Sequence, residues 1–443
     1  MSWEGVSLGG RQTAKEGRRG TDDGFASIPR RPSLVPWWSL ALSHAAVGMY
    51  LTARLGFYPA LSAAFHLNYQ QLGLITTVTT LVASLGQPAL GALGDRLGPR
   101  LLLPWGLALL GLGTGLIGLM PGYPAVVGLA GVSVLGVAAF WPVGAAVVTA
   151  IAPPAQRGTA FAIFQASGSL GAVIGPLVAN DVLAVAGLRG TVLLIPIGLA
   201  AALLLWSTLC PAVIQAEGLP DGLPMRRSLL TGLGLPLLIM VAAALVLTCY
   251  NSYLTVLETG RGVPQEVANR ELSLLFVAGV LGPFLAGPLS DRLGRSPVIA
   301  ACLAGSVGTH LAFLFAPLPW RLLALALTGM LLPGAATLAV LLAQEMRPEA
   351  RATAAGVVQG LGYTGAALGS WLVGALADAW GPVSALSTLA PVAASGALMA
   401  LALRSFPLPR SSSRGGVILS STPTLPHPGG GAERAWLSTS LAR

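Results

Sequence analysis

Two stretches of this sequence place polar and aromatic side chains inside long apolar runs, where they could bind a solute. In the first, Tyr50, Arg54 and Tyr58 are four residues apart and would share one stripe of a helix. An arginine deep in an apolar run is a functional candidate, and its guanidinium can hold an anionic group through two hydrogen bonds. The alternative is that Arg54 extends to a membrane interface or pairs with Asp181.

The second stretch, CYNSYLTVLE, is the densest polar and aromatic cluster within an apolar run. Asn251, Thr255 and Glu258 lie along one helical stripe, and Tyr250 and Tyr253 flank it. Rigid aromatic rings with a few polar groups are typical of sites for small organic molecules. A helix end that leaves a membrane would also be polar, so that interpretation stays open.

The bulk composition indicates which elements must position these residues. The chain has 443 residues, of which 54% are hydrophobic and 9% charged, whereas soluble domains carry about 25% charged residues. A lipid bilayer is therefore the expected solvent and partner. The basic residues behind the net charge of +9 lie in the ends of the chain and in short breaks between apolar runs. This distribution does not indicate nucleic-acid binding.

The cysteines and the sequence motifs indicate neither a metal nor a cofactor. Cys210, Cys249 and Cys302 lie far apart within apolar runs, so buried free thiols are expected rather than a zinc site or disulfides. The sequence contains no nucleotide-binding P-loop, so an ATP-driven pump is not expected.

The apolar runs are each close to the ~20 residues that cross about 30 Å of hydrocarbon as a helix. The alternation typical of membrane β-barrel strands is absent. We therefore predict an all-α membrane protein with twelve transmembrane helices, at 38–61, 70–93, 101–120, 124–149, 158–182, 190–212, 229–257, 271–290, 297–317, 320–344, 352–376 and 382–403.

The arginines predict the orientation. More of them occur in the loops on the side of the two chain ends than in the opposite loops, which places both termini in the cytoplasm. The two ends show no helical period and are expected to be disordered. The predicted organisation is a tail at 1–35, a six-helix bundle at 36–214, a cytoplasmic linker at 215–228, a second six-helix bundle at 229–404 and a tail at 405–443.

Two strings recur across the chain with nearly the same separation. GALGDRLGPR, from Gly91, returns as GPLSDRLGRS, from Gly287, and RGTAFAIFQASGSLGAVIG, from Arg157, returns as RATAAGVVQGLGYTGAALG, from Arg351. Coincident Arg, Thr and Gln are more informative than coincident Gly in a chain with 57 glycines. We therefore predict two pseudo-symmetric parallel halves, an architecture that places the substrate site of a transporter between them.

The string G-x-x-x-D-R-x-G, at 91–98 and 287–294, resembles the loop signature of the major facilitator superfamily. The resemblance implies a secondary transporter that works by alternating access. It also implies a conformational latch, in which the loop aspartate engages the positive N-terminal end of a helix of the other half. The latch residues would be Gly91, Asp95, Arg96, Gly98, Arg100, Gly287, Asp291, Arg292 and Gly294, with Arg351 near Asp95 and Arg157 near Asp291. The alternative is that the loop arginines only anchor the loops inside.

The string GSLGAVIGP resembles the G-x-x-x-G-P motif of drug–proton antiporters in this superfamily. Small residues let helices approach closely, and the proline kinks the helix. The motif usually ends in two glycines, where this chain has Ala179 and Asn180, and generic packing between the halves is the alternative. FWPVGAA resembles the fosmidomycin-resistance group of exporters, although Trp141 stands where histidine is more frequent. The predicted helix-packing residues are Gly171, Gly175, Pro176, Gly365 and Gly369.

In this superfamily spans 1, 4, 7 and 10 line the central cavity, so the resemblance implies that their polar and aromatic residues contact the cargo. The predicted substrate-cavity residues are Tyr50, Arg54, Tyr58, Phe140, Trp141, Tyr250, Asn251, Tyr253, Thr255 and Thr337. No carboxylate occurs near the centre of a span, so proton coupling would fall to His44, Asp181 or Glu258.

These observations predict a secondary transporter of the inner membrane that acts as a monomer. It would export a small organic compound or drug in exchange for protons. The alternative is uptake of a small organic anion, with Arg54 as its counter-charge. A membrane enzyme or a non-transporting scaffold is not favoured, because the spans contain no paired carboxylates and no cluster of metal ligands.

Overall fold

The computed structural model describes residues 37–152, 157–209, 232–347 and 351–403. These ranges are helical and contain no strand, which confirms the predicted all-α class. The tails predicted at 1–35 and 405–443 and the linker predicted at 215–228 lie outside the described residues.

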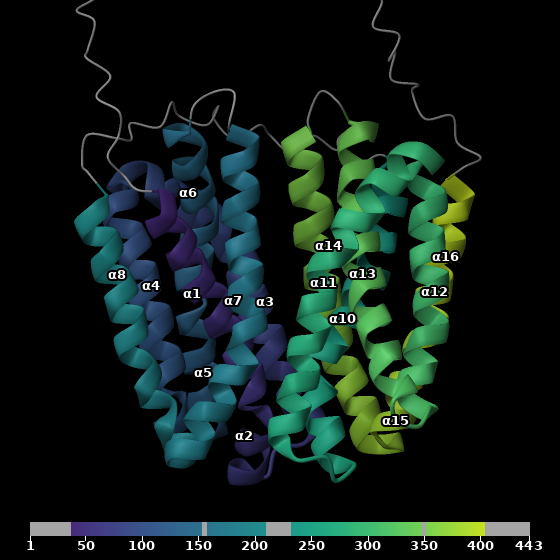
Figure 1. The fold of residues 1–443 in the computed structure, drawn as a ribbon, viewed down its shortest axis with the longest axis horizontal. Coiled ribbons are helices and arrows are strands. Elements are labelled where there is room, and N and C mark those ends of the chain that lie inside the picture. The colour runs from purple at the N-terminus through teal and green to yellow at the C-terminus, as the bar shows by residue number, and fades with distance from the viewer. Residues whose placement is uncertain (1–36, 153–156, 210–231, 348–350, 404–443) are drawn as a thin grey trace, which may run out of the picture.

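The first half of the chain forms one bundle, on the left in Figure 1. Its first helix breaks at Phe57, so the first predicted span consists of two consecutive helices. The elements are α1 (Trp37–Gly56), α2 (Tyr58–Phe65), α3 (Tyr69–Leu97), α4 (Pro99–Leu116), η1 (Ile117–Leu119), α5 (Tyr123–Ser133), α6 (Leu135–Ile151), α7 (Arg157–Ala186), η3 (Gly187–Leu194) and α8 (Ile195–Thr208).

The second half of the chain forms the other bundle, on the right in Figure 1. Its elements are α10 (Gly234–Gly260), α11 (Gln265–Leu293), α12 (Arg295–Phe315), α13 (Trp320–Met346), α14 (Arg351–Trp380), α15 (Pro382–Ser387) and α16 (Leu389–Ala402).

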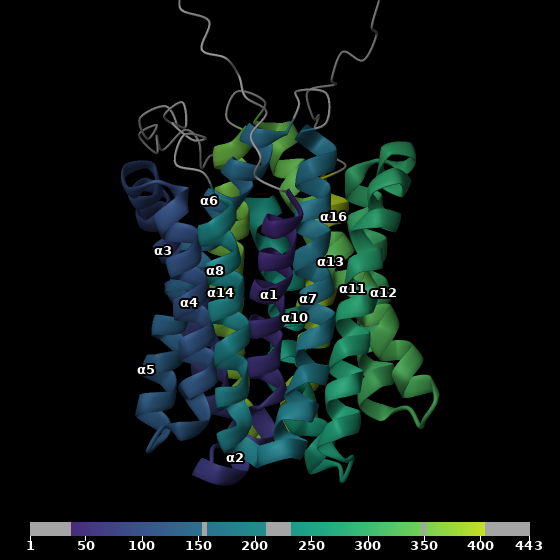
Figure 2. The ribbon, with the colours of Figure 1, turned by 60° about the vertical axis from the view of Figure 1, so that its left-hand side comes forward.

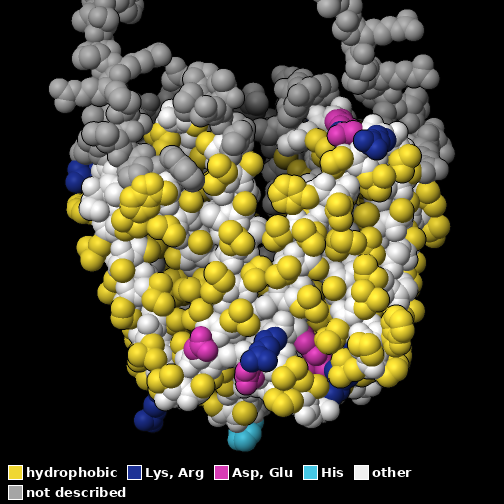
Figure 3. Space-filling view, in the orientation of Figure 1, with side chains coloured by type: hydrophobic (Ala, Val, Ile, Leu, Met, Phe, Trp, Pro, Cys, Tyr) yellow, Lys and Arg dark blue, Asp and Glu magenta, His cyan; other side chains and the backbone are white. Residues whose placement is uncertain are grey.

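The helices of the described residues are compatible with the predicted twelve crossings. Nine segments are long and apolar enough to cross a membrane. One of them, Ala160–Thr208, is 49 residues long and contains two crossings, because η3 separates α7 from α8. Helices α1 and α14, of 20 and 30 residues, add two more. Figure 3 shows apolar side chains over the middle of the viewed face and charged side chains near its two ends.

Two equivalent helices end at a glycine with positive φ. Helix α3 is followed by Gly98, whose φ is 77°, and α11 is followed by Gly294, whose φ is 91°. Glycine adopts this backbone conformation without strain, because it has no Cβ atom. The next helix therefore begins directly after the glycine in both halves.

Each half contributes the same two helices to the seam between the halves. Helix α3 packs against α14, and α7 packs against α11. In the sequence repeat α3 corresponds to α11 and α7 corresponds to α14. The two contacts are therefore related to each other, as expected for halves that share an axis along the membrane normal. The predicted pseudo-symmetry is confirmed.

Among the described residues, contacts between the halves close the seam near one end of the molecule. We call the end where α1 begins and α16 ends the terminal face, and the opposite end, which carries α2 and α15, the distal face (Figures 1 and 2). Among the described residues, hydrogen bonds between the halves come from the distal part of the helices, from Thr77 with Ala367 to Gln70 with Asp378. The space-filling view shows a cleft between the halves that opens toward the terminal face (Figure 3).

Helices α1 and α7 approach closely because glycines line α7 at their contact. A Cβ atom on Gly171 would clash with the carbonyl oxygen of Ala45, and one on Gly175 would clash with Oγ1 of Thr52. Both contacts lie within the N-terminal bundle, so this glycine stripe packs α7 against α1 and not one half against the other.

We expect Gly171→Ala to destabilise the protein and the repeat-related Gly365→Ala to be tolerated. A methyl group at 171 would meet a backbone oxygen, whereas one at 365 would lie 3.2 Å from a side-chain methyl of Val241. Overpacking typically costs about 1–3 kcal/mol, and the helical Gly→Ala change itself contributes about 0.5–1 kcal/mol of stability. Thermal unfolding in detergent measures both variants, and equal unfolding midpoints would contradict the expectation.

Candidate functional site

A chain of hydroxyl groups crosses the seam between the halves. Tyr58 Oη and Thr76 Oγ1 are 3.0 Å apart, and Ser252 Oγ of the other half donates to the same threonine oxygen at 3.0 Å. Ser370 Oγ donates in turn to Ser252 Oγ at 3.3 Å. Helices α2, α3, α10 and α14 therefore meet at one polar site. We call it the seam cluster, formed by Arg54, Tyr58, Thr76, Thr79, Ser252 and Ser370.

Arg54 supplies the charge of the seam cluster. Its side chain is 5% exposed, and its Nη2 donates to Thr79 Oγ1 at 3.4 Å. Among the described residues, its Nε and Nη1 have no hydrogen-bond partner, and no carboxylate forms an ion pair with it. A buried cation without a counter-charge destabilises a folded protein, so such groups usually serve a ligand. The seam cluster can therefore receive an anionic group.

Helices α3 and α14 come into backbone contact beside the seam cluster. A Cβ atom on Gly374 would lie 2.8 Å from Gln70 Cα. Tyr253 Oη donates to the carbonyl oxygen of Ser370 at 2.6 Å and occupies the space that a side chain at Gly73 would need. Glycine at both positions therefore lets the tyrosine hydroxyl of α10 reach between the two helices.

Side chains near the distal face join the halves at both seams. At the α3–α14 seam, the carboxylate oxygens of Asp378 accept hydrogen bonds from the backbone N–H groups of Tyr69 and Gln70, at 2.8 and 2.9 Å. At the α7–α11 seam, Asn269 Nδ2 donates to Asn180 Oδ1 at 2.7 Å. Asn180 stands where the antiporter motif has glycine, so this departure from the motif supplies a contact between the halves.

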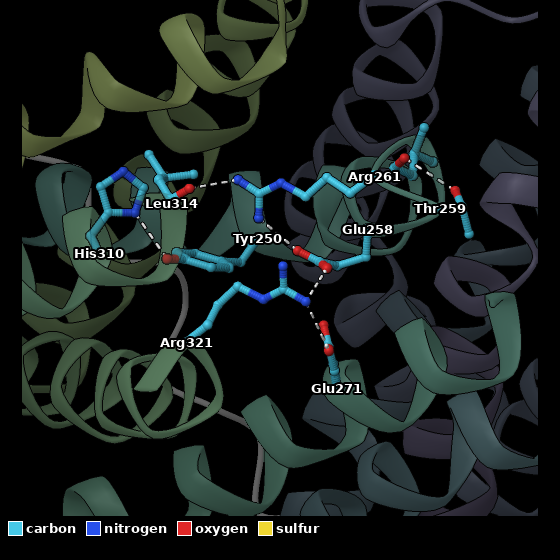
Figure 4. Close-up of polar contacts among 9 residues, drawn as sticks. Tyr250, Glu258, Thr259, Arg261, Glu271, His310, Leu314 and Arg321 are labelled. Carbon is cyan, nitrogen blue, oxygen red and sulfur yellow. Dashed lines mark hydrogen bonds and ion pairs between the residues drawn. The ribbon is translucent and has the colours of Figure 1, made fainter. Parts of the chain in front are cut away.

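A second polar site lies inside the C-terminal half near the distal face (Figure 4). Glu258 of α10 is fully buried, with Oε1 2.9 Å from Arg261 Nη1 and Oε2 2.9 Å from Arg321 Nη2. The same Arg321 nitrogen lies 3.8 Å from Oε1 of Glu271 on α11. We call these four residues the distal charge cluster.

Three predicted cavity residues point into the interior of a bundle. Tyr50 Oη donates to the carbonyl oxygen of Leu194 at 2.5 Å within the N-terminal half. Phe140 is fully buried beside the ring of His44. Tyr250 Oη lies 2.9 Å from Nδ1 of His310 within the C-terminal half. The structure does not bring these side chains to the seam cluster.

The other predicted cavity residues divide into two groups. Tyr253 reaches the seam, as does Thr255, whose Oγ1 donates to the carbonyl oxygen of Leu55 at 3.4 Å. No described contact joins Asn251, Trp141 or Thr337 to the seam cluster; Asn251 Oδ1 is buried without a partner, and the other two side chains are exposed. Contact of these residues with cargo stays a prediction.

The three residues predicted for proton coupling have different surroundings. The His44 ring stacks on Phe164, with ring centroids 4.0 Å apart, and its Nδ1 lies 2.6 Å from the Phe164 carbonyl oxygen. Asp181 is exposed near the distal end of α7. Glu258 is held between two arginines. Their coupling role stays a prediction.

The predicted latch is described in part. Asp291 pairs with Arg295 at 2.5 Å, and Arg295 pairs with Glu345 at 2.9 Å, so the described partners of Asp291 belong to its own half. Arg100 lies over the ring of Trp206 at 5.2 Å, and Arg96 and Arg292 are exposed. The side chains of Asp95, Arg157 and Arg351 lie outside the described residues. A latch across the seam therefore stays a prediction.

Sequence reasoning missed the residues that complete both clusters. Thr76 and Thr79 are small polar residues on a helix that the resemblance does not assign to the cavity. Glu271 is the first residue of a predicted span, yet α11 begins at Gln265 and encloses it. Charges at membrane depth pair with one another. The sequence signal for the distal charge cluster was therefore the presence of two carboxylates and two arginines near the predicted ends of the spans.

Two repeated six-helix bundles, with a polar site in the seam between them, define a membrane transporter of small molecules. The chain belongs to the Major Facilitator Superfamily, whose family model matches residues 40–269 and again residues 236–439. The two matches overlap at residues 236–269, and each contains one copy of the repeated strings.

Curated relatives agree with this family. The chain is 26% identical over 349 residues to the fosmidomycin resistance protein of Escherichia coli (strain K12), which covers 77% of this chain and 86% of that protein. It is also 26% identical over 336 residues to an uncharacterized MFS-type transporter, YfnC, of Bacillus subtilis (strain 168), which covers 73% of this chain and 82% of that protein.

Solved structures of transporters share the fold. A bacterial homolog of the human lysosomal transporter Spinster, in an inward-facing and occupied conformation, superposes with a TM-score of 0.72 at 17% identity, over 84% of this chain and 96% of that chain. A D-xylose–proton symporter gives a TM-score of 0.67 at 16% identity, over 82% of this chain and 96% of that chain.

Proposed function

We propose that this protein exports a small organic compound across the inner (plasma) membrane in exchange for protons, by alternating access between its two halves. It acts as a monomer, with the terminal face and both termini in the cytoplasm. The seam cluster is the central site that the cargo reaches from either side in turn.

The observation that carries this proposal is the unequal closure of the seam. Hydrogen bonds join the halves near the distal face, and a cleft opens toward the terminal face (Figure 3). Alternating access requires a site between two halves that is open to one side at a time. It also requires that the contacts closing the other side break when the halves move relative to each other. Export is supported by the Escherichia coli relative, which is a fosmidomycin resistance protein.

A second candidate function is uptake of a small organic anion. It is favoured by one observation, the two unpartnered nitrogens of the buried Arg54. An anionic group held there would provide the missing counter-charge.

Transport into proteoliposomes tests the proposal. Labelled fosmidomycin and a panel of neutral and anionic organic compounds are offered with and without an imposed pH gradient. We expect at least one compound to move against the direction of the protons, and faster with the gradient than without it. Movement in the same direction as the protons would support uptake instead, and no movement of any compound would contradict both candidates.

A further inference from the structure

We propose that Glu271 is the residue that binds and releases the coupling proton. The inference deepens the proton-driven transport proposed above and rests on it. Glu271 lies in the second turn of α11, near the distal face, with its carboxylate turned toward Arg321 and Glu258 (Figure 4). It is not among the residues that the sequence predicted for this role.

Glu271 is a buried carboxylate to which no described residue donates a hydrogen bond. Its side chain is 4% exposed, its Oε2 has no partner in the described part of the chain, and its Oε1 lies 3.8 Å from Arg321 Nη2. Glu258 beside it is different, because its Oε1 accepts a hydrogen bond from Arg261 Nη1 at 2.9 Å, and its Oε2, which accepts no hydrogen bond from a described residue, still lies 2.9 Å from Arg321 Nη2. A buried carboxylate keeps its charge only when it is paired and hydrogen-bonded, and otherwise takes up a proton. Of the two glutamates, Glu271 is therefore the one that binds the proton.

The remaining groups around Glu271 are already engaged. Arg261 donates to Glu258 at 2.9 Å and to the carbonyl oxygen of Leu314 at 2.8 Å. His310 of α12 uses both ring nitrogens, toward Tyr250 Oη and the carbonyl oxygen of Leu386. On α11 itself, Arg270 and Glu266 pair with each other at the surface. Arg321, shared with Glu258, is thus the cation that Glu271 approaches when it loses the proton.

The same turn of α11 closes the distal face. Asn269 is fully buried, and its Nδ2 donates to Asn180 Oδ1 at 2.7 Å and to the carbonyl oxygen of Gly56 at 3.2 Å, both in the other half. Residues two positions apart point to nearly opposite sides of a helix. Helix α11 therefore presents Asn269 to the N-terminal half and Glu271 to the interior of its own half. A charge change that shifts this turn toward or away from Arg321 also shifts the contact that closes the seam.

The proposed step is a reversible protonation. One O–H bond forms on the Glu271 carboxylate when a proton arrives from water at the distal face, and the same bond breaks when the proton leaves. No other bond changes and no further reactant is needed. The protonated acid leaves Arg321 to Glu258 alone, and the ionised carboxylate competes with Glu258 for it.

Carbodiimide labelling tests the site without a mutation and without a known cargo. Dicyclohexylcarbodiimide adds to protonated carboxylic acids in apolar surroundings and leaves a stable acylurea, which peptide mass spectrometry locates. In proteoliposomes between about pH 5.5 and pH 8.5, we expect labelling of Glu271 that falls as the pH rises, and about tenfold less labelling of the doubly paired Glu258. Absence of label on Glu271 over this range, or equal labelling of Glu258, would overturn the proposal.

Transport by Glu271→Gln gives a second test, because glutamine resembles the protonated acid but cannot release a proton. With fosmidomycin as the probe and a pH-sensitive dye inside the vesicles, we expect the variant to lose proton movement coupled to fosmidomycin and to retain exchange of labelled for unlabelled fosmidomycin. Glu266→Gln, at an exposed position on the same helix, is the matched control and should behave as wild type. Coupled proton movement in Glu271→Gln would refute the assignment. Absence of fosmidomycin transport by the wild-type protein would count against the proposed function alone, since the labelling still decides the role of Glu271.

Discussion

Arg54→Gln is expected to lower the affinity for an anionic cargo by about tenfold to 150-fold and to leave transport of neutral compounds unchanged. A hydrogen bond to a charged group contributes about 1.5–3 kcal/mol, and every 1.4 kcal/mol is about a tenfold change in affinity. Arg54 is 5% exposed and has two free nitrogens, so an anionic group bound there would be bonded in surroundings with little water. Concentration dependence of uptake in proteoliposomes measures the change.

The same substitution should raise the stability of the empty protein. Arg54 has no described counter-charge, and an uncompensated buried charge is destabilising by several kcal/mol. Removing it should therefore increase the thermal unfolding midpoint while binding is lost, a combination typical of residues kept for function at the expense of stability. A purely structural Arg54 would show the reverse, a lower midpoint.

Two further variants separate charge from geometry. Arg54→Lys keeps the charge but loses the planar fork of donors, so partial retention of anion transport would indicate that charge dominates. Arg270→Gln removes the same charge at an exposed position on the distal side and should change neither stability nor transport appreciably, since exposed ion pairs contribute about 0–1 kcal/mol. Equal effects of Arg54→Gln on anionic and neutral compounds would contradict a specific anion site.

The sequence was sufficient for the fold because membrane insertion imposes a strong pattern. Apolar runs of the length of a bilayer, the recurrence of the string around Asp95 and Asp291, and the loop signature lead to two six-helix halves, which the structure and the family match confirm. The limit is the direction in which each side chain points. Tyr50 and Arg54 share a stripe of α1, yet Tyr50 bonds to Leu194 inside the bundle, whereas Arg54 bonds to Thr79, which lies three residues along α3 from Thr76 at the seam.

The helices packed around α1 determine what Tyr50 and Arg54 contact. A shared stripe on α1 does not reveal which helices those are. Tyr50 fits against Gly111 and Gly198, two glycines from helices far apart in the sequence. The distal charge cluster was hidden for a similar reason, since its members come from three helices and each looks like an ordinary span end on its own. Periodicity predicts which residues share a face, whereas tertiary packing decides what that face meets.

Asp378→Asn is expected to shift the protein toward a conformation that is open at the distal face. Both Asp378 oxygens accept backbone hydrogen bonds from Tyr69 and Gln70, in the first turn of α3 in the other half. The other N–H groups of that turn are bonded locally, by Asn68 and Gln71. Asp378 therefore completes the cap of a helix that belongs to the opposite bundle.

The dipoles of the two helices favour a charged Asp378 in this contact. It lies near the C-terminal end of α14, where the helix dipole disfavours an anion, and it faces the N-terminal end of α3, where the dipole favours one. Asparagine removes the charge and one of the two accepting oxygens. A coupling of about 1–3 kcal/mol corresponds to a change of about 5-fold to 150-fold in a conformational equilibrium, which is large enough to see as a second population.

Electron–electron distances between spin labels at Ala63 of α2 and Ala379 of α14 would measure the opening. Both side chains are exposed, and the native cysteines are first replaced.

Gly374→Leu should produce the same shift by a different cause, because its side chain would be driven into the backbone of α3 at Gln70. Glu266→Gln is the control, since it removes an exposed acidic side chain whose described ion pair lies in its own half. The control should leave the distance between the two spin labels unchanged. If Asp378→Asn also left this distance unchanged, the cap on α3 would not be what holds the distal face closed.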